Sequence, residues 1–349
     1  MKLIPTIYLV MFAIIGFGCK KADPFVAGKP VKQTYSINTI NFQALNYGKD
    51  GMFGFSNRGK MYLVGGWNGG NMPTTDNEQW VSLDDGYTWS RIKNAPFRRR
   101  HTVASETVND KNYIVGGDYY NYIYYKRYQK DSWVFDNGNW TQISKSTGIG
   151  NRVLAELVFL NGLFYLIGGQ VSLSPGDGVY TSVLMSKDSC ATFEKIGDTP
   201  FADGNLWGAV AAFNGKIWKI GGGIYSDNLD QRTYPKEIYS SPDGINWTME
   251  GIFPGKGRSY AQLVVFNKKL WLIHGFNHRE GNNLNDTWFT YDGINWVKSA
   301  LNDTHSRHAH SAWADSRHLY WAGGSSNEWP YYLSDVVRQS HESLIKTQE

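Results

Sequence analysis

The sequence has few cysteines and few charged residues. Only 2 of its 349 residues are Cys, and the four charged residue types make up 19% of the chain. Two cysteines cannot build the disulfide framework of a small secreted domain. The formal net charge of +4 and the short run Arg98-Arg99-Arg100 are too little positive charge to indicate a nucleic-acid-binding surface. We therefore expect a globular protein without a nucleic-acid partner, and we expect it to be a monomer.

Long helical patterns are missing as well. After residue 30 no extended stretch places apolar residues at helical spacing, whereas short apolar runs recur between Asn-Gly, Asp-Gly and Gly-Gly pairs. Glycine is abundant with 38 residues, as are Trp with 14 and Tyr with 22. Short strands, tight turns and many aromatic residues favour an all-β fold.

A single long apolar run lies at the N-terminus of the sequence. Lys2 is followed by apolar residues over 3–17 and then by Gly18-Cys19. A basic start, a short apolar segment and small residues before a cleavage point are the marks of a secretory signal. The string Gly-Phe-Gly-Cys resembles a bacterial lipoprotein signal, and this resemblance implies that the thiol of Cys19 is acylated. We expect a signal peptide over 1–18, a lipidated flexible tether over 19–33, one domain over 34–349, and an exported protein held by lipid in the bacterial cell envelope.

An apolar strand that ends in two glycines recurs along the chain. Examples are Met-Tyr-Leu-Val-Gly-Gly at 61–66 and Phe-Tyr-Leu-Ile-Gly-Gly at 164–169. The first position of the pair occurs six times at intervals of 49 to 53 residues, at Gly65, Gly116, Gly168, Gly221, His274 and Gly323. Six near-equal periods indicate a repeat architecture. Glycine suits a place where the chain turns sharply beside a neighbouring sheet, because a Cβ there would clash.

Each period holds four short strands, and the pattern resembles the kelch repeat. Besides the double glycine, the resemblance rests on aromatic pairs in the strands that follow it, namely Trp80/Trp89, Trp133/Trp140, Tyr239/Trp247 and Trp288/Trp296. It covers residues 49 to about 338 and implies an all-β, six-bladed kelch-type β-propeller with four-stranded antiparallel blades. The sixth period ends after its third strand, near 334–339. We expect an N-terminal strand over 35–44 to complete this blade and close the ring.

The turns between the third and fourth strands resemble the Asp-box of sialidases. Residues 82–89 match the pattern S-x-D-x-G-x-T-W, and residues 186–193 match it loosely with Cys190 in the glycine position. Shorter versions occur at 241–244 and 291–293. We expect a structural role, in which the Asp and Ser side chains bond turn amides and the aromatic residue fills the gap between blades.

Long loops are expected on one face of the propeller only. The turns between first and second strands are as short as Asn161-Gly162, whereas the loops between second and third strands are much longer. The long loops are rich in aromatic residues, among them Tyr120, Tyr124 and Trp329. This asymmetry indicates one working surface.

A basic residue stands sixteen positions before the repeat marker in five of the six periods. The six positions hold Lys49, Arg100, Arg152, Asn205, Arg258 and Arg307, and close to them stand His101, Trp207, Tyr260 and His308. In a propeller they would form a ring around the mouth of the central channel. Two interpretations stay open: these residues bond carbonyl groups of the blades, or they bind a carboxylate or phosphate while the aromatic residues stack on a sugar or a peptide.

Two functions fit this pattern. The first is a surface-anchored module that binds an anionic ligand, namely an acidic glycan, peptide or protein, as kelch propellers commonly do. The second is an enzyme similar to the exported kelch-type N-acetylneuraminate epimerases, or mutarotases, which act on an anionic sugar and need an acid/base group near the anomeric oxygen. That family keeps a Glu directly after a repeat glycine. The only acidic residue in such a position here is Asp118, which is the catalytic candidate, with turn capping as its alternative role.

Other activities find less support in the sequence. A sialidase would need a Tyr–Glu nucleophile pair and an N-terminal Arg-Ile-Pro motif, and neither is recognisable. Galactose-oxidase-like copper chemistry needs a Cys near the axis, whereas Cys190 is expected on the rim. The pair His308 and His310 is one H-x-H, which is too little to predict a zinc site. We therefore expect no cofactor and no metal.

Overall fold

The computed structural model describes residues 35–41, 48–68, 75–121, 125–171, 178–201, 208–224, 228–303, 305–328 and 331–341. All of them belong to one compact unit, Tyr35–Glu342. Among them, no helix is long and apolar enough to cross a membrane. Several sequence predictions fall outside these ranges: the signal peptide, the tether, Cys19, Asn205, Trp207, Tyr124 and Trp329. Tyr120 lies in a described strand, but its side chain is not described.

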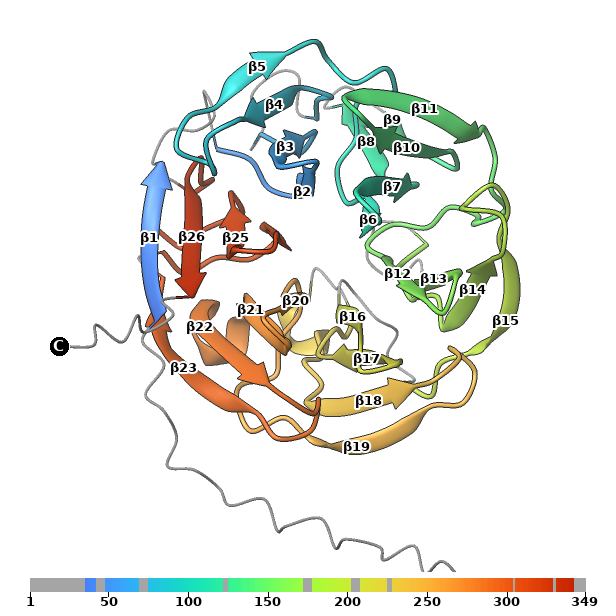
Figure 1. Ribbon diagram of the computed structural model, residues 1–349. Coiled ribbons are helices and arrows are strands. Elements are labelled where there is room, and N and C mark those ends of the chain that lie inside the picture. The colour runs from blue at the N-terminus through green and yellow to red at the C-terminus, as the bar shows by residue number, and fades with distance from the viewer. Residues whose placement is uncertain are drawn as a thin grey trace, which may run out of the picture. The chain divides into compact units, whose positions relative to one another are not determined.

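The described strands form six four-stranded antiparallel sheets around a common axis (Figure 1). Blade 1 contains β2 (Phe53–Asn57), β3 (Lys60–Val64), β4 (Gln79–Ser82) and β5 (Ser90–Ile92). Blade 2 contains β6 (Ala104–Val108), β7 (Lys111–Val115), β10 (Ser132–Asp136) and β11 (Asn139–Ser144). Blade 3 contains β12 (Glu156–Leu160), β13 (Leu163–Ile167), β14 (Ser182–Ser186) and β15 (Glu194–Asp198).

The other three blades follow the same order. Blade 4 contains β16 (Ala209–Phe213), β17 (Lys216–Ile220), β18 (Glu237–Ser241) and β19 (Thr248–Ile252). Blade 5 contains β20 (Gln262–Phe266), β21 (Lys269–Asn277), β22 (Asn282–Thr290) and β23 (Val297–Asn302). Blade 6 contains β24 (Ser311–Ala314), β25 (His318–Ala322), β26 (Val336–His341) and, as its outermost strand, β1 (Tyr35–Asn41).

The ring closes as the sequence predicts. β1 pairs antiparallel with β26, from Tyr35 opposite His341 to Asn41 opposite Val336. The innermost strands of neighbouring blades contact one another in a complete circuit, from β2 through β6, β12, β16, β20 and β24 back to β2. The six-bladed all-β fold is thereby confirmed.

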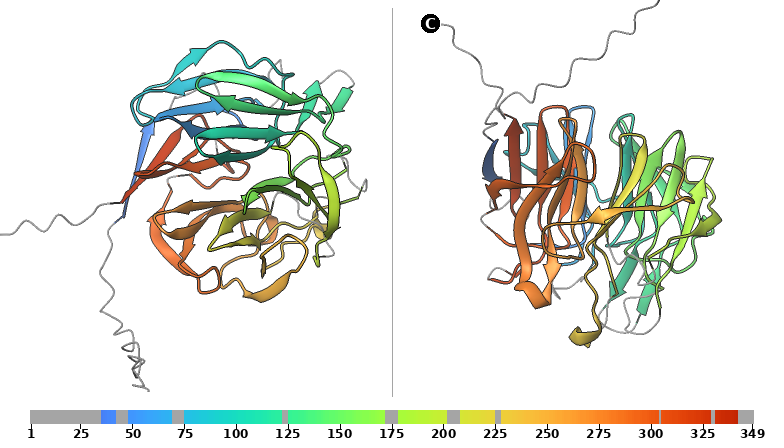
Figure 2. Two further views of the ribbon diagram at one scale, coloured as in Figure 1. Left: turned by 45° about the vertical axis from the view of Figure 1, so that its right-hand side comes forward. Right: turned by 90° about the horizontal axis from the view of Figure 1, so that it is seen from below.

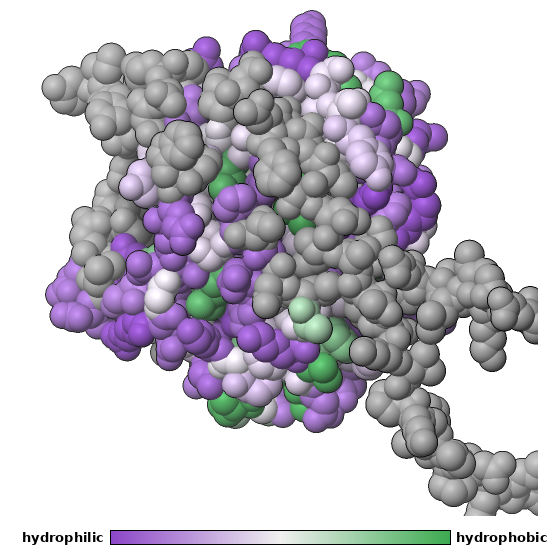
Figure 3. Space-filling view, turned by 90° about the vertical axis from the view of Figure 1, so that its left-hand side faces the viewer, coloured by the Kyte–Doolittle hydropathy of each residue, from purple (hydrophilic) through white to green (hydrophobic). Residues whose placement is uncertain are grey.

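The hydrophobic core is divided among the six blade interfaces. Between blades 1 and 2, for example, Phe55, Tyr62 and Phe135 pack together, and between blades 5 and 6 Trp271 packs with Trp321. The side of the propeller that Figure 3 shows is mostly hydrophilic in its coloured part, with isolated hydrophobic side chains. The aromatic residues therefore serve mainly to fill the gaps between sheets that diverge from the axis.

The double glycine has the role that the sequence predicts. Gly65 and Gly66 have φ angles of 67° and 106°, which side-chain-bearing residues rarely adopt. A Cβ on Gly66 would lie 2.9 Å from the carbonyl oxygen of Asp50. The pair is required because two segments of backbone approach each other here.

The Asp-box turns are structural, as expected. In blade 1 the Ser82 hydroxyl accepts from the amide of Gly86 at 2.8 Å, and Asp84 accepts from the amide of Thr88 at 2.8 Å. The indole of Trp89 donates to the Gly86 carbonyl. Cys190 occupies the equivalent of Gly86 in blade 3 with a φ of 69° and is fully buried between blades 2 and 3.

The loops differ from the sequence prediction in two places. The loop after β7 contains a hairpin of its own, β8 (Asp118–Asn121) and β9 (Tyr125–Tyr128). In blade 5 the expected loop over 276–285 is mostly strand, because β21 and β22 continue to η2 (His278–Glu280). The β8–β9 hairpin, η2 and η1 (Leu229–Gln231) project from the same face of the propeller (Figure 2, right). We call this the loop face and the opposite one, which carries the short turns, the turn face.

Candidate functional site

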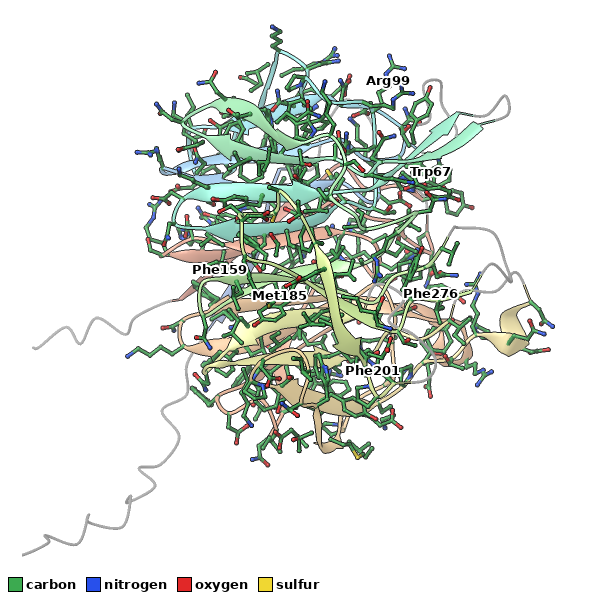
Figure 4. The ribbon with its side chains drawn as sticks, turned by 90° about the vertical axis from the view of Figure 1, so that its right-hand side faces the viewer. Trp67, Arg99, Phe159, Met185, Phe201 and Phe276 are labelled. Carbon is green, nitrogen blue, oxygen red and sulfur yellow. The ribbon has the colours of Figure 1, made fainter. Side chains whose placement is uncertain are left out.

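A ring of paired positions lines the loop face near the axis. In each of five blades, the residue that precedes the innermost strand by a few positions forms an isolated bridge with the residue after the repeat glycines. The bridges join Asp50 to Trp67, His101 to Asp118, Val153 to Gln170, Ser259 to Phe276, and His308 to Ser325. Figure 4 shows Trp67 and Phe276 towards the loop face, and Phe159 and Met185 towards the turn face. The repeat thus brings two residues per blade to the face where the sequence predicts the site.

The predicted basic ring forms, but its charged groups are held inside the blades. The Arg100 guanidinium donates to the Gly116 carbonyl at 2.9 Å and to both carboxylate oxygens of Asp131 at 2.7 and 2.9 Å. The same arrangement joins Arg258 to the His274 carbonyl and Asp286, and Arg307 to the Gly323 carbonyl and Asp335. In blade 1, Lys49 Nζ lies 2.7 Å from Asp76 and 2.8 Å from Glu78.

These contacts favour the first interpretation of the ring, in which it stabilises the blades. Lys49, Arg100, Arg152, Arg258 and Arg307 are each at most 3% exposed. In blades 2, 5 and 6 both terminal nitrogens of the Arg donate to the Asp carboxylate, so the charged ends of these side chains are engaged within the blade. The contacts therefore do not support the prediction that these five side chains bind an anionic ligand.

Arg152 in blade 3 differs from the other arginines of the ring. It donates to the Gly168 carbonyl and, at 2.7 Å, to the Ser182 hydroxyl, and Ser182 replaces the carboxylate that blades 2, 5 and 6 provide. Its guanidinium also lies 4.0 Å from the centre of the Tyr180 ring. Burial lowers the pKa of Arg152 to about 10. In blade 3 the buried Arg152 guanidinium is therefore hydrogen-bonded, among the described residues, only to uncharged groups.

Two predicted site residues, His101 and Asp118, meet at the loop face. His101 Nδ1 lies 2.8 Å from Asp118 Oδ1, and the hydroxyl of Thr102 donates to the same oxygen at 2.7 Å. Burial lowers the pKa of His101, but the charges of Asp118 and Asp50 outweigh it and leave this pKa above its usual value. Because Asp118 engages Nδ1, Nε2 is the nitrogen left for proton exchange.

A second carboxylate, Asp50 of blade 1, stands beside this pair. Its side chain accepts a hydrogen bond from the hydroxyl of Ser325 at 2.8 Å. Burial raises the pKa of Asp50 to about 6, although His101 and Ser325 act in the opposite direction. The neighbouring Gly51 is needed here, since a Cβ on it would meet the His101 ring at 3.0 Å. Blades 1, 2 and 6 thus assemble an imidazole that contacts one carboxylate and interacts electrostatically with a second, which suits acid–base chemistry.

The other predicted residues near the axis form an aromatic group on blades 5 and 6. The Tyr260 and His308 rings lie 5.2 Å apart, and His308 is bonded through Nδ1 to Asn283. Burial, followed by the charge of Arg232, lowers the pKa of His308 to about 4, so this ring is neutral near pH 7. His308 and His310 point to different neighbours, because Ala309 between them has a φ of 52° and interrupts the strand alternation.

Apolar residues and backbone hydrogen bonds connect neighbouring blades beside this group. Leu154 and Ala309 are buried against each other, with Tyr260 and Tyr128 packed on them. Backbone hydrogen bonds link Thr102 to Gly51 and Gly51 to Ala309 across blade boundaries. The candidate site therefore lies beside the axis, over blades 1, 2 and 6.

These features define a kelch-type six-bladed β-propeller with an acid–base cluster on its loop face. No protein-family model matches the chain. The N-acetylneuraminate epimerase of Pasteurella multocida (strain Pm70) is 24% identical to it over 201 residues, which are 56% of this chain and 46% of that protein. The chain thus matches about half the length of this relative. The solved structure of YjhT aligns with a TM-score of 0.65 at 14% identity over 85% of this chain and 96% of that one, which shows a shared fold.

Sequence reasoning identified His101 and Asp118 but missed Asp50 and the partner role of Ser325. The signal was present, because Asp50, His101 and His308 all stand directly after the basic-ring position of their blades. Residues at that position form the bridges of the loop face, whereas the basic residues before them turn into the blades.

Proposed function

We propose that this protein is an acid–base enzyme of the mutarotase type that acts on an anionic sugar at its loop face. The observation that carries the proposal is the cluster in which His101 contacts Asp118 and interacts electrostatically with Asp50. The similarity to an N-acetylneuraminate epimerase supports the choice of a sugar acid as substrate. A binding module alone would not need a carboxylate and an imidazole with shifted pKa values, those of Asp50 and His101, at one place.

The chemistry needs one proton acceptor and one proton donor. Mutarotation opens the bond between the anomeric carbon and the ring oxygen and closes it again on the other face of the resulting carbonyl group. Opening removes a proton from the anomeric hydroxyl and delivers one to the ring oxygen. The Asp50 carboxylate takes the first proton, the His101 imidazolium gives the second, and ring closure reverses both transfers. Asp118 positions the imidazole and stabilises its charged form.

The pH dependence follows from these assignments. Asp50 has a pKa of about 6, so its basic form and the rate are lost as the pH falls below that value. The pKa of His101 is raised, so its acidic form persists above the ordinary range of histidine and is lost at higher pH. A bell-shaped profile is expected.

The test is NMR exchange spectroscopy of N-acetylneuraminate anomers with and without the protein. The wild type should accelerate exchange, and His101→Gln and Asp50→Asn should each remove most of the acceleration. His318→Gln is the control, since His318 lies at the start of β25 and bonds Tyr320. If the wild type binds the sugar acid but does not accelerate exchange, the protein is not a mutarotase and the binding-module function is favoured instead.

We also propose that the protein is exported and lipid-anchored through Cys19, on the basis of the N-terminal sequence. Cells fed a labelled fatty acid should incorporate it into the wild type and not into Cys19→Ser. Cys190→Ser is the control, because that thiol is buried in the propeller. Equal labelling of the wild type and Cys19→Ser would contradict the anchor.

A further inference from the structure

The proposed function leaves unused a cavity in the central channel. It has a volume of about 520 Å³ and is lined by the innermost strands of all six blades. The lining reaches Asn109 in the turn between β6 and β7 and includes Phe159, which Figure 4 shows towards the turn face. A narrower recess of about 70 Å³ shares Glu156 and Gln262 with it and extends to His310. This space lies towards the end of the axis opposite the acid–base cluster.

Two carboxylates on neighbouring blades face this cavity. Glu106 comes from β6 and Glu156 from β12. Burial raises the pKa of Glu106 to about 8, and burial together with the charge of Glu106 raises the pKa of Glu156 well above its usual value. Among the described residues, those that line the cavity and its recess include no Lys or Arg. Glu156 Oε1 is buried and has no hydrogen-bond partner within the described part of the chain.

An independent observation comes from the inner end of the cavity. His310 is 1% exposed, and neither of its ring nitrogens has a hydrogen-bond partner among the residues that the structure describes. Burial lowers the pKa of His310 well below its usual value, so the ring is neutral and one nitrogen is an acceptor. A buried imidazole with no partner, lining the same recess as an unpaired carboxylate oxygen, indicates a missing hydrogen-bond donor.

The walls between these acceptors are apolar and aromatic. Phe159 and Trp313 line the cavity together with Leu157, Val264 and several alanines. Aromatic side chains next to carboxylates suit a cation that carries alkyl groups, because the ring faces attract its charge. A metal ion fits less well, since no three His, Cys, Asp or Glu side chains of the described residues are grouped to hold one.

We propose that this cavity binds a small organic cation with an ammonium group. The Glu106 and Glu156 carboxylates face its charge, the neutral His310 imidazole accepts from a donor that reaches the recess, and Phe159 and Trp313 contact its alkyl part. The proposal does not rest on the loop-face activity, because the two sites share no residue. It can fail or hold whatever the outcome of the anomer-exchange experiment.

The test is calorimetric titration of the full protein with choline, with n-butylammonium and with 3,3-dimethylbutan-1-ol, which has the shape of choline without its charge. Choline or n-butylammonium should bind about tenfold more tightly than the neutral alcohol. Glu106→Gln with Glu156→Gln should weaken that binding by about tenfold or more. Glu194→Gln is the matched control, since its side chain is 63% exposed on β15.

The pH dependence provides a second readout. In the part of the lining that the structure describes, the titratable groups are Glu106, Glu156 and His310. Since His310 is neutral, ammonium affinity should rise from about pH 6 to about pH 9 as the carboxylates ionise. Equal binding of choline and the alcohol, undiminished binding by the folded double variant, or no binding of either cation to the wild type would each overturn the proposal.

Discussion

The two ends of the central axis differ in whether their buried ionisable groups have partners of opposite charge. We call the end at the loop face the loop end and the end at the turn face the turn end. At the loop end several buried ionisable groups are paired with opposite charges: Arg307 lies 2.7 Å from Asp335 and 2.9 Å from Asp303, and His101 lies 2.8 Å from Asp118. At the turn end, the described residues that line the cavity shared by Glu106 and Glu156 include no Lys or Arg, and His310 in the adjoining recess is neutral. Buried charges that stabilise the fold have partners of opposite charge. Buried ionisable groups without such partners raise the free energy of the folded state, and they therefore indicate a ligand-binding site.

The largest effect on stability is expected from removing the cation of a buried ion-pair network at the loop end. Arg307→Leu leaves the carboxylates of Asp303 and Asp335 buried without their cation, which should lower the free energy of unfolding by about 3–5 kcal/mol. Urea denaturation measures the loss. Arg58→Leu is the control, because Arg58 pairs with Asp136 on the surface and should change stability by less than about 1 kcal/mol. Equal losses in the two variants would show that pairing at the loop end is not what stabilises blade 6.

The next effect concerns His101 and Asp118, the pair on which the proposed acid–base activity depends. Asp118→Asn keeps the shape of the side chain but removes the charge next to His101, so anomer exchange should slow by about a hundredfold. The alkaline limb of the pH profile should also move to lower pH, because the imidazolium loses its stabilising partner. NMR exchange rates across the pH range measure both. A slower rate with an unmoved profile would show that Asp118 only supports the loop.

This contrast also shows how far the sequence reaches. The period between repeat glycines predicts the number of blades, because each glycine pair marks the same close approach of backbone in every blade. The constant offset of the basic residues predicts that they form a ring, but it does not predict whether their side chains point into the blades or towards the channel. Arg100 turns inward because Asp131, which lies thirty-one residues away in the chain, completes its hydrogen bonds. Such a pairing depends on tertiary contact that a periodic pattern does not contain.

The turn-end carboxylates were missed for a related reason. Glu106 and Glu156 stand in innermost strands that read Ala-Ser-Glu-Thr-Val and Glu-Leu-Val-Phe-Leu, and neither string shows that the Glu side chain faces a cavity. Their meeting depends on the register of two neighbouring sheets around the axis. The loop-face pair was easier to find, because His101 and Asp118 belong to one blade and sit at fixed distances from its repeat glycines.

Removing the turn-end carboxylates should stabilise the propeller. A carboxyl whose pKa is raised from 4.5 to about 8 on folding binds more protons in the folded than in the unfolded state between these values, so the free energy of unfolding falls as the pH rises through that window. Glu106→Gln with Glu156→Gln should therefore gain about 1–3 kcal/mol at pH 8 and much less at pH 4.5. Denaturation at the two pH values measures the difference. If the double variant is less stable than the wild type at pH 8, the two carboxylates have stabilising partners and the interpretation is wrong.

The smallest effect is expected at Arg152, the basic-ring arginine of the loop end that has no carboxylate partner among the described residues. Arg152 bonds the hydroxyl of Ser182, whereas the corresponding arginines of blades 2, 5 and 6 have carboxylates. Ser182→Asp should supply the missing charge and raise the free energy of unfolding by about 1 kcal/mol, because a cation held on neutral partners gains a charged one. Ser182→Asn is the control that adds similar bulk without charge. If Ser182→Asp destabilises blade 3 more than Ser182→Asn does, charge matching does not govern this position, and the contact of Arg152 with the Tyr180 ring is what the blade requires.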